Sequence, residues 1–140
     1  MRRYIILSLS LCLALWAGFA AAQTADKEKA AVAAAEQWLS LVDSGNYQQS
    51  WKEAAELFRK AVPEQQWLQS LEAVRAPLGK LKSRKVKSST YTTSLPGAPD
   101  GEYVVIQFDT SFDNKGSSIE TVTPMFEKEG TWRVSGYFVK

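Results

Sequence analysis

Apolar residues in the first half of the chain recur every three or four positions, the spacing that gathers them on one face of an α-helix. This pattern predicts three helices, which cover residues 30–42, 47–60 and 63–75. Gly45 and Asn46 separate the first two, because glycine can end a helix in a left-handed conformation and asparagine can cap the next one. Pro63 suits the first position of the third helix, where a backbone N–H is not needed.

Beyond residue 78 the pattern changes to alternation of apolar and polar positions, with many β-branched and aromatic residues, which is typical of strands. The predicted strands cover residues 90–93, 102–112, 118–128 and 131–139. Pro124 lies inside the third of them and indicates an edge or a bulge, because proline cannot donate to a strand ladder. Helices followed by antiparallel strands predict an α+β fold, with three helices packed on one face of a sheet of about four strands.

Alternation also assigns side chains to the two faces of the predicted sheet. The apolar set, which we expect to meet the helices, comprises Val104, Ile106, Phe108, Phe112, Trp132, Val134 and Phe138. The opposite set comprises Tyr103, Gln107, Asp109, Ser111, Arg133, Ser135 and Tyr137. This second face is polar but keeps aromatic residues, so we expect it to be solvated or to form an oligomer surface.

The N-terminus carries the three parts of a secretory signal peptide. Arg2 and Arg3 form a basic start, residues 4–19 form an apolar run, and three alanines at positions 20–22 precede Gln23. The competing interpretation is a membrane anchor, but the apolar run is short for a transmembrane helix, which needs roughly 20 residues. We therefore expect Sec-type export, cleavage after residue 22 and a periplasmic or secreted protein with no stable membrane anchor.

The signal peptide divides the chain into three parts. Residues 1–22 are expected to be removed, the polar residues 23–29 are predicted to be a flexible lead-in, and residues 30–140 are predicted to form a single domain.

Composition excludes several chemistries. The chain has no histidine, and its one cysteine, Cys12, lies within the predicted signal peptide. This excludes His-based catalysis, Cys-His nucleophiles and zinc sites that need imidazole, and we expect no metal and no cofactor. The 17 basic and 15 acidic residues become equal in number once Arg2 and Arg3 are removed. A neutral domain is not typical of nucleic-acid binders.

Four tryptophans are the candidate ligand-binding residues. Three of them lie on the apolar faces of different predicted helices and the fourth lies on a strand: Trp38, Trp51, Trp67 and Trp132. They are suited to line the mouth of a cavity and to stack on a flat or apolar ligand. The competing interpretation is that they fill the core between helices and sheet, which is the commoner role of aromatic residues at helical spacing.

Asp109 is the candidate catalytic base, with Tyr103 as a proton donor beside it. Such chemistry needs a dry pocket, whereas alternation places both residues on the polar face of the sheet. A cross-strand ion pair between Asp109 and Arg133 on a wet or dimeric face explains the pattern equally well. Tyr103, Asp109, Arg133 and Tyr137 are therefore also the candidate interface residues.

A basic cluster follows the predicted helices and comprises Lys80, Lys82, Arg84, Lys85 and Lys87. It is suited to contact phosphate-bearing lipid, lipopolysaccharide or an acidic protein. The competing interpretation is a solvated edge strand, where lysines prevent aggregation.

Four segments of the chain resemble a bacterial family of small exported proteins, known as domain-of-unknown-function family 4019. They are residues 38–47, 95–105, 120–125 and 132–137. The resemblance implies a cone-shaped α+β roll, similar to nuclear-transport-factor-2-like and cystatin-like proteins. Pro63 departs from the family pattern, in which a Thr or Ser helix cap is expected. The resemblance implies no activity, and it assigns no functional residue.

Three functions remain open at this point. The leading hypothesis is a non-catalytic periplasmic domain that binds a small molecule or a protein partner. The alternatives are an enzyme of the cone-roll type with Asp109 as base, and a structural homo-oligomer such as a homodimer. A small-molecule binder predicts an apolar cavity among the helix tryptophans. An enzyme predicts an inward-facing carboxylate, and an oligomer predicts a filled core.

Overall fold

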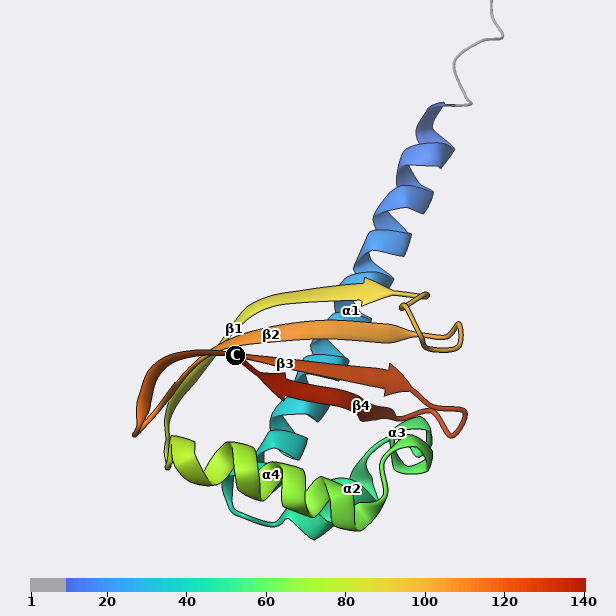
Figure 1. Ribbon diagram of the computed structural model, residues 1–140. Coiled ribbons are helices and arrows are strands. Elements are labelled where there is room, and N and C mark those ends of the chain that lie inside the picture. Colours follow the sequence, from blue (N-terminus) through green and yellow to red (C-terminus); the bar gives the residue numbers. More distant parts are fainter. Residues whose placement is uncertain (1–9) are drawn as a thin grey trace, which may run out of the picture.

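The computed structural model describes residues 10–140 and has an α+β architecture, as the pattern predicts (Figure 1). Its helices are α1 (Ser10–Asp43), α2 (Tyr47–Glu53), α3 (Glu56–Ala61) and α4 (Glu64–Leu78). Its strands are β1 (Leu81–Thr92), β2 (Tyr103–Phe112), β3 (Lys115–Phe126) and β4 (Trp132–Val139). The strands form one antiparallel sheet in the order β1-β2-β3-β4, so β1 and β4 are its edges.

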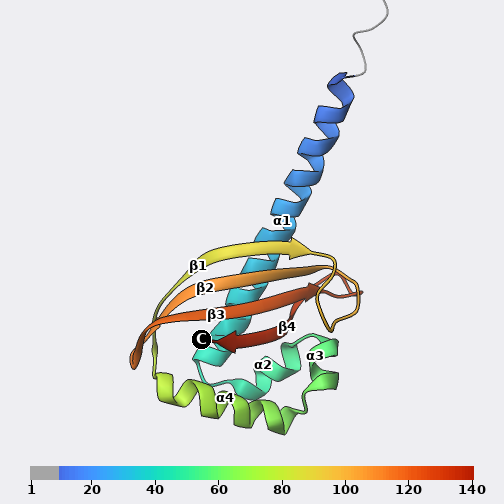
Figure 2. The same cartoon turned by 45° about the horizontal axis from the view of Figure 1, so that its top comes forward.

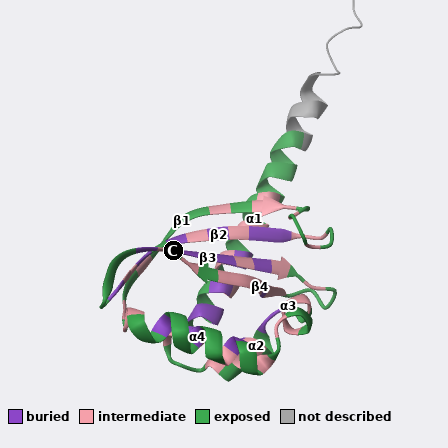
Figure 3. Ribbon diagram, viewed as in Figure 1, coloured by how far each residue is buried: buried purple, intermediate pink, exposed green. Residues whose placement is uncertain are grey.

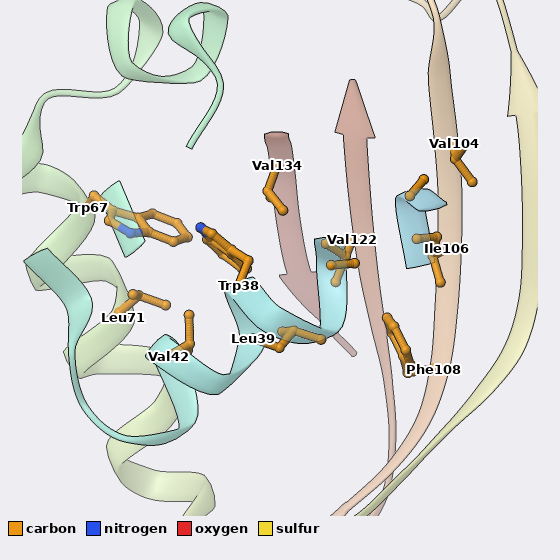
Figure 4. Packing of buried hydrophobic residues seen from close by; sticks show 12 residues of the cluster. Trp38, Leu39, Val42, Trp67, Leu71, Val104, Ile106, Phe108, Val122 and Val134 are labelled. Carbon is orange, nitrogen blue, oxygen red and sulfur yellow. The ribbon is translucent and has the colours of Figure 1, made fainter. Parts of the chain in front are cut away.

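Helix α1 packs across the sheet and contacts all four strands, while α2 and α4 lie beside it on the same side of the sheet (Figures 1 and 2). Its buried residues fall at helical spacing, namely Ala31, Ala35, Trp38, Leu39 and Val42. They meet inward-facing residues of β2, β3 and β4, of which Ile106, Val122 and Val134 appear in Figure 4. The core therefore lies between α1, α4 and one face of the sheet.

Helix α1 begins much earlier than the sequence predicts. The predicted start near residue 30 is wrong, because the helix includes residues 23–29 as well. Two charged residues in this stretch bind the sheet: Lys27 forms an ion pair with Glu102, and a carboxylate oxygen of Glu28 accepts a hydrogen bond from the backbone N–H of Tyr91. Residues 1–9 of the predicted signal peptide lie outside the described residues. Within the described part of the chain, no helix combines the length and the hydropathy needed to cross a bilayer.

The helices number four, because the predicted helix over residues 47–60 is divided into α2 and α3. The break falls at Ala54 and Ala55, which are fully buried and have extended backbone conformations. The backbone N–H of Ala55 donates to the carbonyl oxygen of Val134 at 2.8 Å. The helix is interrupted where its backbone bonds to edge strand β4, and alanine is small enough to allow this close approach.

The third predicted helix corresponds to α4, with small shifts at both ends. Pro63 precedes α4 as its cap residue, and the helix continues through Pro77 to end before Gly79. Gly79 has a positive φ of 75°, and a Cβ there would lie 3.1 Å from the side chains of Asp113 and Asn114. Only glycine fits this turn into β1 without strain.

A bulge in β4 reverses the predicted faces at the end of that strand. Thr123 of β3 lies opposite Gly136, but the next residue, Pro124, lies opposite Val134, so Ser135 is an extra residue. A bulge changes which side chains point inward. The placement of Phe138 inside and Tyr137 outside is therefore wrong. Pro124 lies at this bulge. The sequence predicted either an edge or a bulge at this proline, and the bulge is confirmed.

This reversal predicts opposite effects for two neighbouring substitutions. Tyr137 packs against the ring of Trp38 with centroids 5.5 Å apart, whereas Phe138 is 51% exposed. We expect Tyr137→Ala to lower the free energy of unfolding by about 3–5 kcal/mol and Phe138→Ala to lower it by about 0.5 kcal/mol or less. Urea denaturation measures both, and the reverse ranking would contradict the register.

Candidate functional site

Trp38 and Trp67, two of the predicted ligand-binding residues, are buried side by side between α1 and α4 (Figure 4). Their ring centroids are 6.1 Å apart. The indole N–H of Trp38 donates to the backbone oxygen of Ser50 at 2.8 Å, and that of Trp67 donates to the Ser50 hydroxyl at 3.0 Å. Both polar atoms are thus occupied within the chain, which is the arrangement of packing residues.

The other two tryptophans have different neighbours. Trp51 is half-buried, and its indole N–H donates to the backbone oxygen of Val62 at 2.8 Å. Trp132 stacks at a tilt on Phe126, with centroids 5.2 Å apart. The structure therefore brings Trp38 and Trp67 into ring contact and gives Trp51 and Trp132 separate packing roles.

The candidate catalytic pair does not form a site. Asp109 is exposed and lies opposite Lys85 across β1 and β2. Tyr103 is buried, and its hydroxyl donates to the backbone oxygen of Pro99 at 2.6 Å. Burial raises the pKa of this tyrosine, with a further contribution from Asp100. The hydroxyl that was to act as a donor is bonded elsewhere.

The predicted ion pair between Asp109 and Arg133 is wrong. Asp109 lies on β2 and Arg133 on β4, and β3 separates these strands. Arg133 pairs instead with Glu129 and Glu127, at the turn between β3 and β4. The four candidate interface residues therefore do not share one surface, because Tyr103 is buried against the loop that holds Pro99 and Tyr137 packs against Trp38.

A cluster of buried charges, not anticipated from the sequence, lies between the C-terminal ends of α1 and α4 and the sheet. It comprises Asp43 at the end of α1, Arg75 of α4, Arg84 of β1 and Glu120 of β3, and we call it the buried ion network. Arg84 is its hub. Its Nη1 lies 2.7 Å from Oδ2 of Asp43, and its Nε lies 2.7 Å from Oε1 of Glu120. One guanidinium thus joins α1 to β3.

Glu120 is fully buried, and its two carboxylate oxygens accept four hydrogen bonds. Besides two bonds from Arg84, Oε1 accepts from the hydroxyl of Thr110 at 2.6 Å and Oε2 accepts from the hydroxyl of Tyr137 at 2.6 Å. A buried carboxylate is tolerated when it is paired and fully hydrogen-bonded. The Glu120 carboxylate of β3 is thus bonded by one side chain from each of the other three strands, β1, β2 and β4.

Ionisation states in the network follow from these contacts. Burial alone would raise the pKa of Asp43, but hydrogen bonds and charges from Arg84 and Arg75 outweigh it and hold that pKa below its usual value. Burial, together with the nearby carboxylate of Glu120, raises the pKa of Tyr137 far above its usual value. The hydroxyl of Tyr137 accordingly donates to Oε2 of Glu120.

Arg75 closes the network from the helical side. It is 5% exposed, and its Nη2 donates to Oδ1 of Asp43 at 2.9 Å. Its guanidinium lies over the ring of Phe112, 4.8 Å from the ring centroid, which is a cation–π arrangement. Its Nε and Nη1 have no hydrogen-bond partner among the residues that the structure describes. Two arginines and two carboxylates balance in charge, so the network offers no free base for chemistry.

Only a faint signal in the sequence pointed to this network. Arg84 was grouped with exposed lysines, but it is the one arginine in that cluster, and arginine is favoured for buried bidentate pairing with carboxylates. Glu120 stands at an inward position of a strand, where a carboxylate needs a partner. The partner could not be identified, since four distant segments have to meet before the pairs exist.

The four lysines of the basic cluster lie on β1, at one edge of the sheet, or directly before it. Lys80, Lys82, Lys85 and Lys87 are exposed, and Figure 3 shows β1 as the least buried strand. The register of β1 shifts at Lys82 and again at Lys87, so both occupy bulges. Lysines and bulges on an edge strand both prevent pairing with another strand. The structure thus confirms that these lysines lie along an edge strand.

Comparison with known proteins supplies a family. The sequence model of DUF4019, described as a protein of unknown function, matches residues 34–137. The chain belongs to the DUF4019 family. No curated protein sequence matches this DUF4019 member. Membership thus identifies the domain but assigns no activity, and the conclusions on function rest on the geometry described above.

The hub position of Arg84 predicts a large loss of stability on its removal. Arg84→Met would leave Glu120 and Asp43 buried without their main partner, and breaking a buried pair in this way costs about 3–5 kcal/mol. Urea unfolding of the purified protein measures the loss. Lys87→Met, on the same strand but exposed, is the control and should cost about 0.5 kcal/mol or less. Equal losses of stability in Arg84→Met and Lys87→Met would contradict the role of Arg84 as hub.

The lowered pKa of Asp43 predicts a pH dependence of stability. Its folded-state pKa lies below the unfolded value of about 3.8. Its contribution is therefore complete above that value and is lost as the pH falls through the lowered native pKa. Between about pH 5 and about pH 2, the stability difference between wild type and Asp43→Asn should shrink. A difference that stays constant or grows on acidification would contradict this assignment.

Proposed function

We propose that this protein is an exported, non-catalytic domain that binds a protein partner through the uncovered face of its sheet. Export is supported by the basic, apolar and small-residue segments at the N-terminus. It is also supported by the setting of the expected cleavage site: residues 17–23 are all exposed, and the first ion pair between α1 and the sheet is made by Lys27. Loss of residues 1–22 would therefore leave the contacts of Lys27 and Glu28 with Glu102 and β1 intact.

The filled inner face of the sheet is the observation that carries this proposal. Trp67 contacts Phe58 at 4.9 Å and Trp38 contacts Tyr137 at 5.5 Å between ring centroids. The polar atoms among these rings are bonded to Ser50 and Glu120. The space in which a flat ligand would stack is occupied by the chain's own aromatic residues, which favours binding at a surface.

The opposite face of the sheet, which we call the outer face, is not covered by α1, α2 or α4 (Figures 1 and 2). At its centre, Thr121 of β3 lies between Gln107 of β2 and Phe138 of β4. Phe138 is half exposed, and the neighbouring Thr123 is uncharged. The ammonium of Lys140 lies 5.7 Å from the Phe138 ring centroid, and Thr121 beneath is buried. A half-exposed aromatic ring on an uncovered sheet face is typical of a protein–protein interface.

The partner expected here presents a flat, mainly uncharged surface with an apolar contact for Phe138. An enzyme based on Asp109 is not favoured, because that carboxylate is exposed and Tyr103 is bonded to Pro99. A second copy of the chain is one possible occupant of the face, and the experiment below distinguishes it by mass.

Photocrosslinking in living cells tests the proposal. A photoreactive phenylalanine analogue in place of Phe138 should form one discrete adduct on illumination, and Thr123→Lys should abolish it because the charge obstructs the same face. The same analogue in place of Val74, which is 44% exposed on α4, is the matched control and should form none. Gln69→Lys, also on α4, should leave the adduct unchanged.

The adduct's mass distinguishes the outcomes. A heterologous adduct supports a separate partner, whereas an adduct of two copies assigns the face to self-association. Equal crosslinking from both positions, or none from position 138, would contradict the use of the outer face. Native mass spectrometry of the same exported protein should show a chain that begins at Gln23 without a bound small molecule, and a retained ligand would overturn the protein-partner proposal.

A further inference from the structure

The lysines at the β1 edge form a surface that the binding function above does not use. We call Lys80, Lys82, Lys85 and Lys87 the lysine edge. All four are exposed, and none forms an ion pair within the part of the chain that the structure describes. The nearest carboxylate in the strand register is Asp109, opposite Lys85. Four unpaired cations along one edge make this the most positive border of the sheet.

The shape of the lysine edge limits what it can bind. From Lys80 to Lys87 an extended strand spans about 23 Å, at roughly 3.3 Å per residue. The bulges at Lys82 and Lys87 interrupt the regular row of backbone groups that a further strand would need. A ligand at this edge would therefore bind through the row of lysine charges and not as an additional strand. An array of mobile anionic groups matches that requirement better than an extended peptide.

The direction of α1 indicates where such an array lies. Glu28 binds Tyr91 and Ser89 of β1, and N-terminal to this contact the helix leaves the sheet and extends beyond the β1 edge (Figures 1 and 2). Residues 10–19 of the apolar run form that end of α1. Under the proposed export this run enters the membrane before cleavage after residue 22, and until that cleavage the β1 edge is the side of the domain nearer the bilayer.

We propose that the lysine edge docks on the anionic phospholipid headgroups of the membrane across which the chain is exported. This inference rests on the proposed export. Lysine ammonium groups near an anionic membrane gain from its negative surface potential, and flexible side chains follow mobile headgroups. With β1 toward the bilayer, the sheet stands on its edge and the outer face points sideways. The outer face and the lysine edge can therefore be engaged at the same time.

Vesicle sedimentation of the exported protein, purified as the cell leaves it, tests this docking. The protein should bind vesicles of phosphatidylglycerol mixed with phosphatidylcholine and should not bind phosphatidylcholine alone. High salt should release it, because surface charges are then screened. Replacing Lys82, Lys85 and Lys87 together with Gln should lower the partition coefficient about fivefold per lysine removed.

A matched variant replaces three exposed lysines remote from β1, namely Lys52, Lys60 and Lys128. It should lower the partition coefficient less than about twofold, although it removes the same charge. Equal losses in both variants, or equal binding to both kinds of vesicle, would overturn the proposal. Retention on immobilised polyglutamate without vesicle binding would also overturn it and assign the edge to an acidic protein. The mass of the purified chain reports cleavage separately, so failed export and failed docking are distinguishable.

Discussion

The salt bridge between Arg84 and Glu120 is the interaction on which the arrangement of this protein depends. Glu120 is fully buried, and a buried carboxylate is severely destabilising unless a cation and further donors surround it. Arg84 supplies the cation, and its Nη1 and Nη2 also donate hydrogen bonds to Asp43 at the end of α1. Through these two carboxylates one side chain fixes the helix against the sheet, and Tyr137 and Thr110 can bind Glu120 only in that arrangement.

Because side chains fill the interior, we place the proposed binding functions on the surface. The inner face of the sheet is filled by aromatic rings and by a charge-balanced network, so the residues with the most unusual chemistry are those that hold the domain together. Two surfaces are proposed to bind other molecules: the outer face, with Phe138 half exposed, and the lysine edge. They lie at right angles, a face and a border of the same sheet, which allows one domain to meet a protein and a membrane together.

The sequence was sufficient for features that depend on local periodicity. Helical spacing placed Trp38 and Trp67 on apolar helix faces, and both are buried; alternation identified the inward residues of β2. It failed where backbone geometry departs from regularity. The bulge at Ser135 exchanges the faces of Tyr137 and Phe138, and no side-chain pattern announces a one-residue insertion.

The candidate site was harder to predict than the fold. Asp109 and Arg133 have opposite charges and were predicted to pair, but β3 lies between their strands. The order of strands in the sheet is a tertiary property that the sequence pattern does not specify. Arg84 and Glu120 are 36 positions apart, and each depends on the other to be buried. A charged residue in a strand is predicted to be exposed to solvent unless its ion-pair partner is known. The buried ion network could therefore be identified only from the structure.

A double-mutant cycle between Arg84 and Glu120 tests the central role of this pair most directly. Arg84→Met, Glu120→Leu and the double variant would be unfolded in urea at neutral pH. If the pair organises the interior, the double variant is more stable than the sum of the single losses implies, with a coupling free energy of about 2–3 kcal/mol. Losses that add to within about 0.5 kcal/mol would show that the two charges act independently, and the account of the interior would then be wrong.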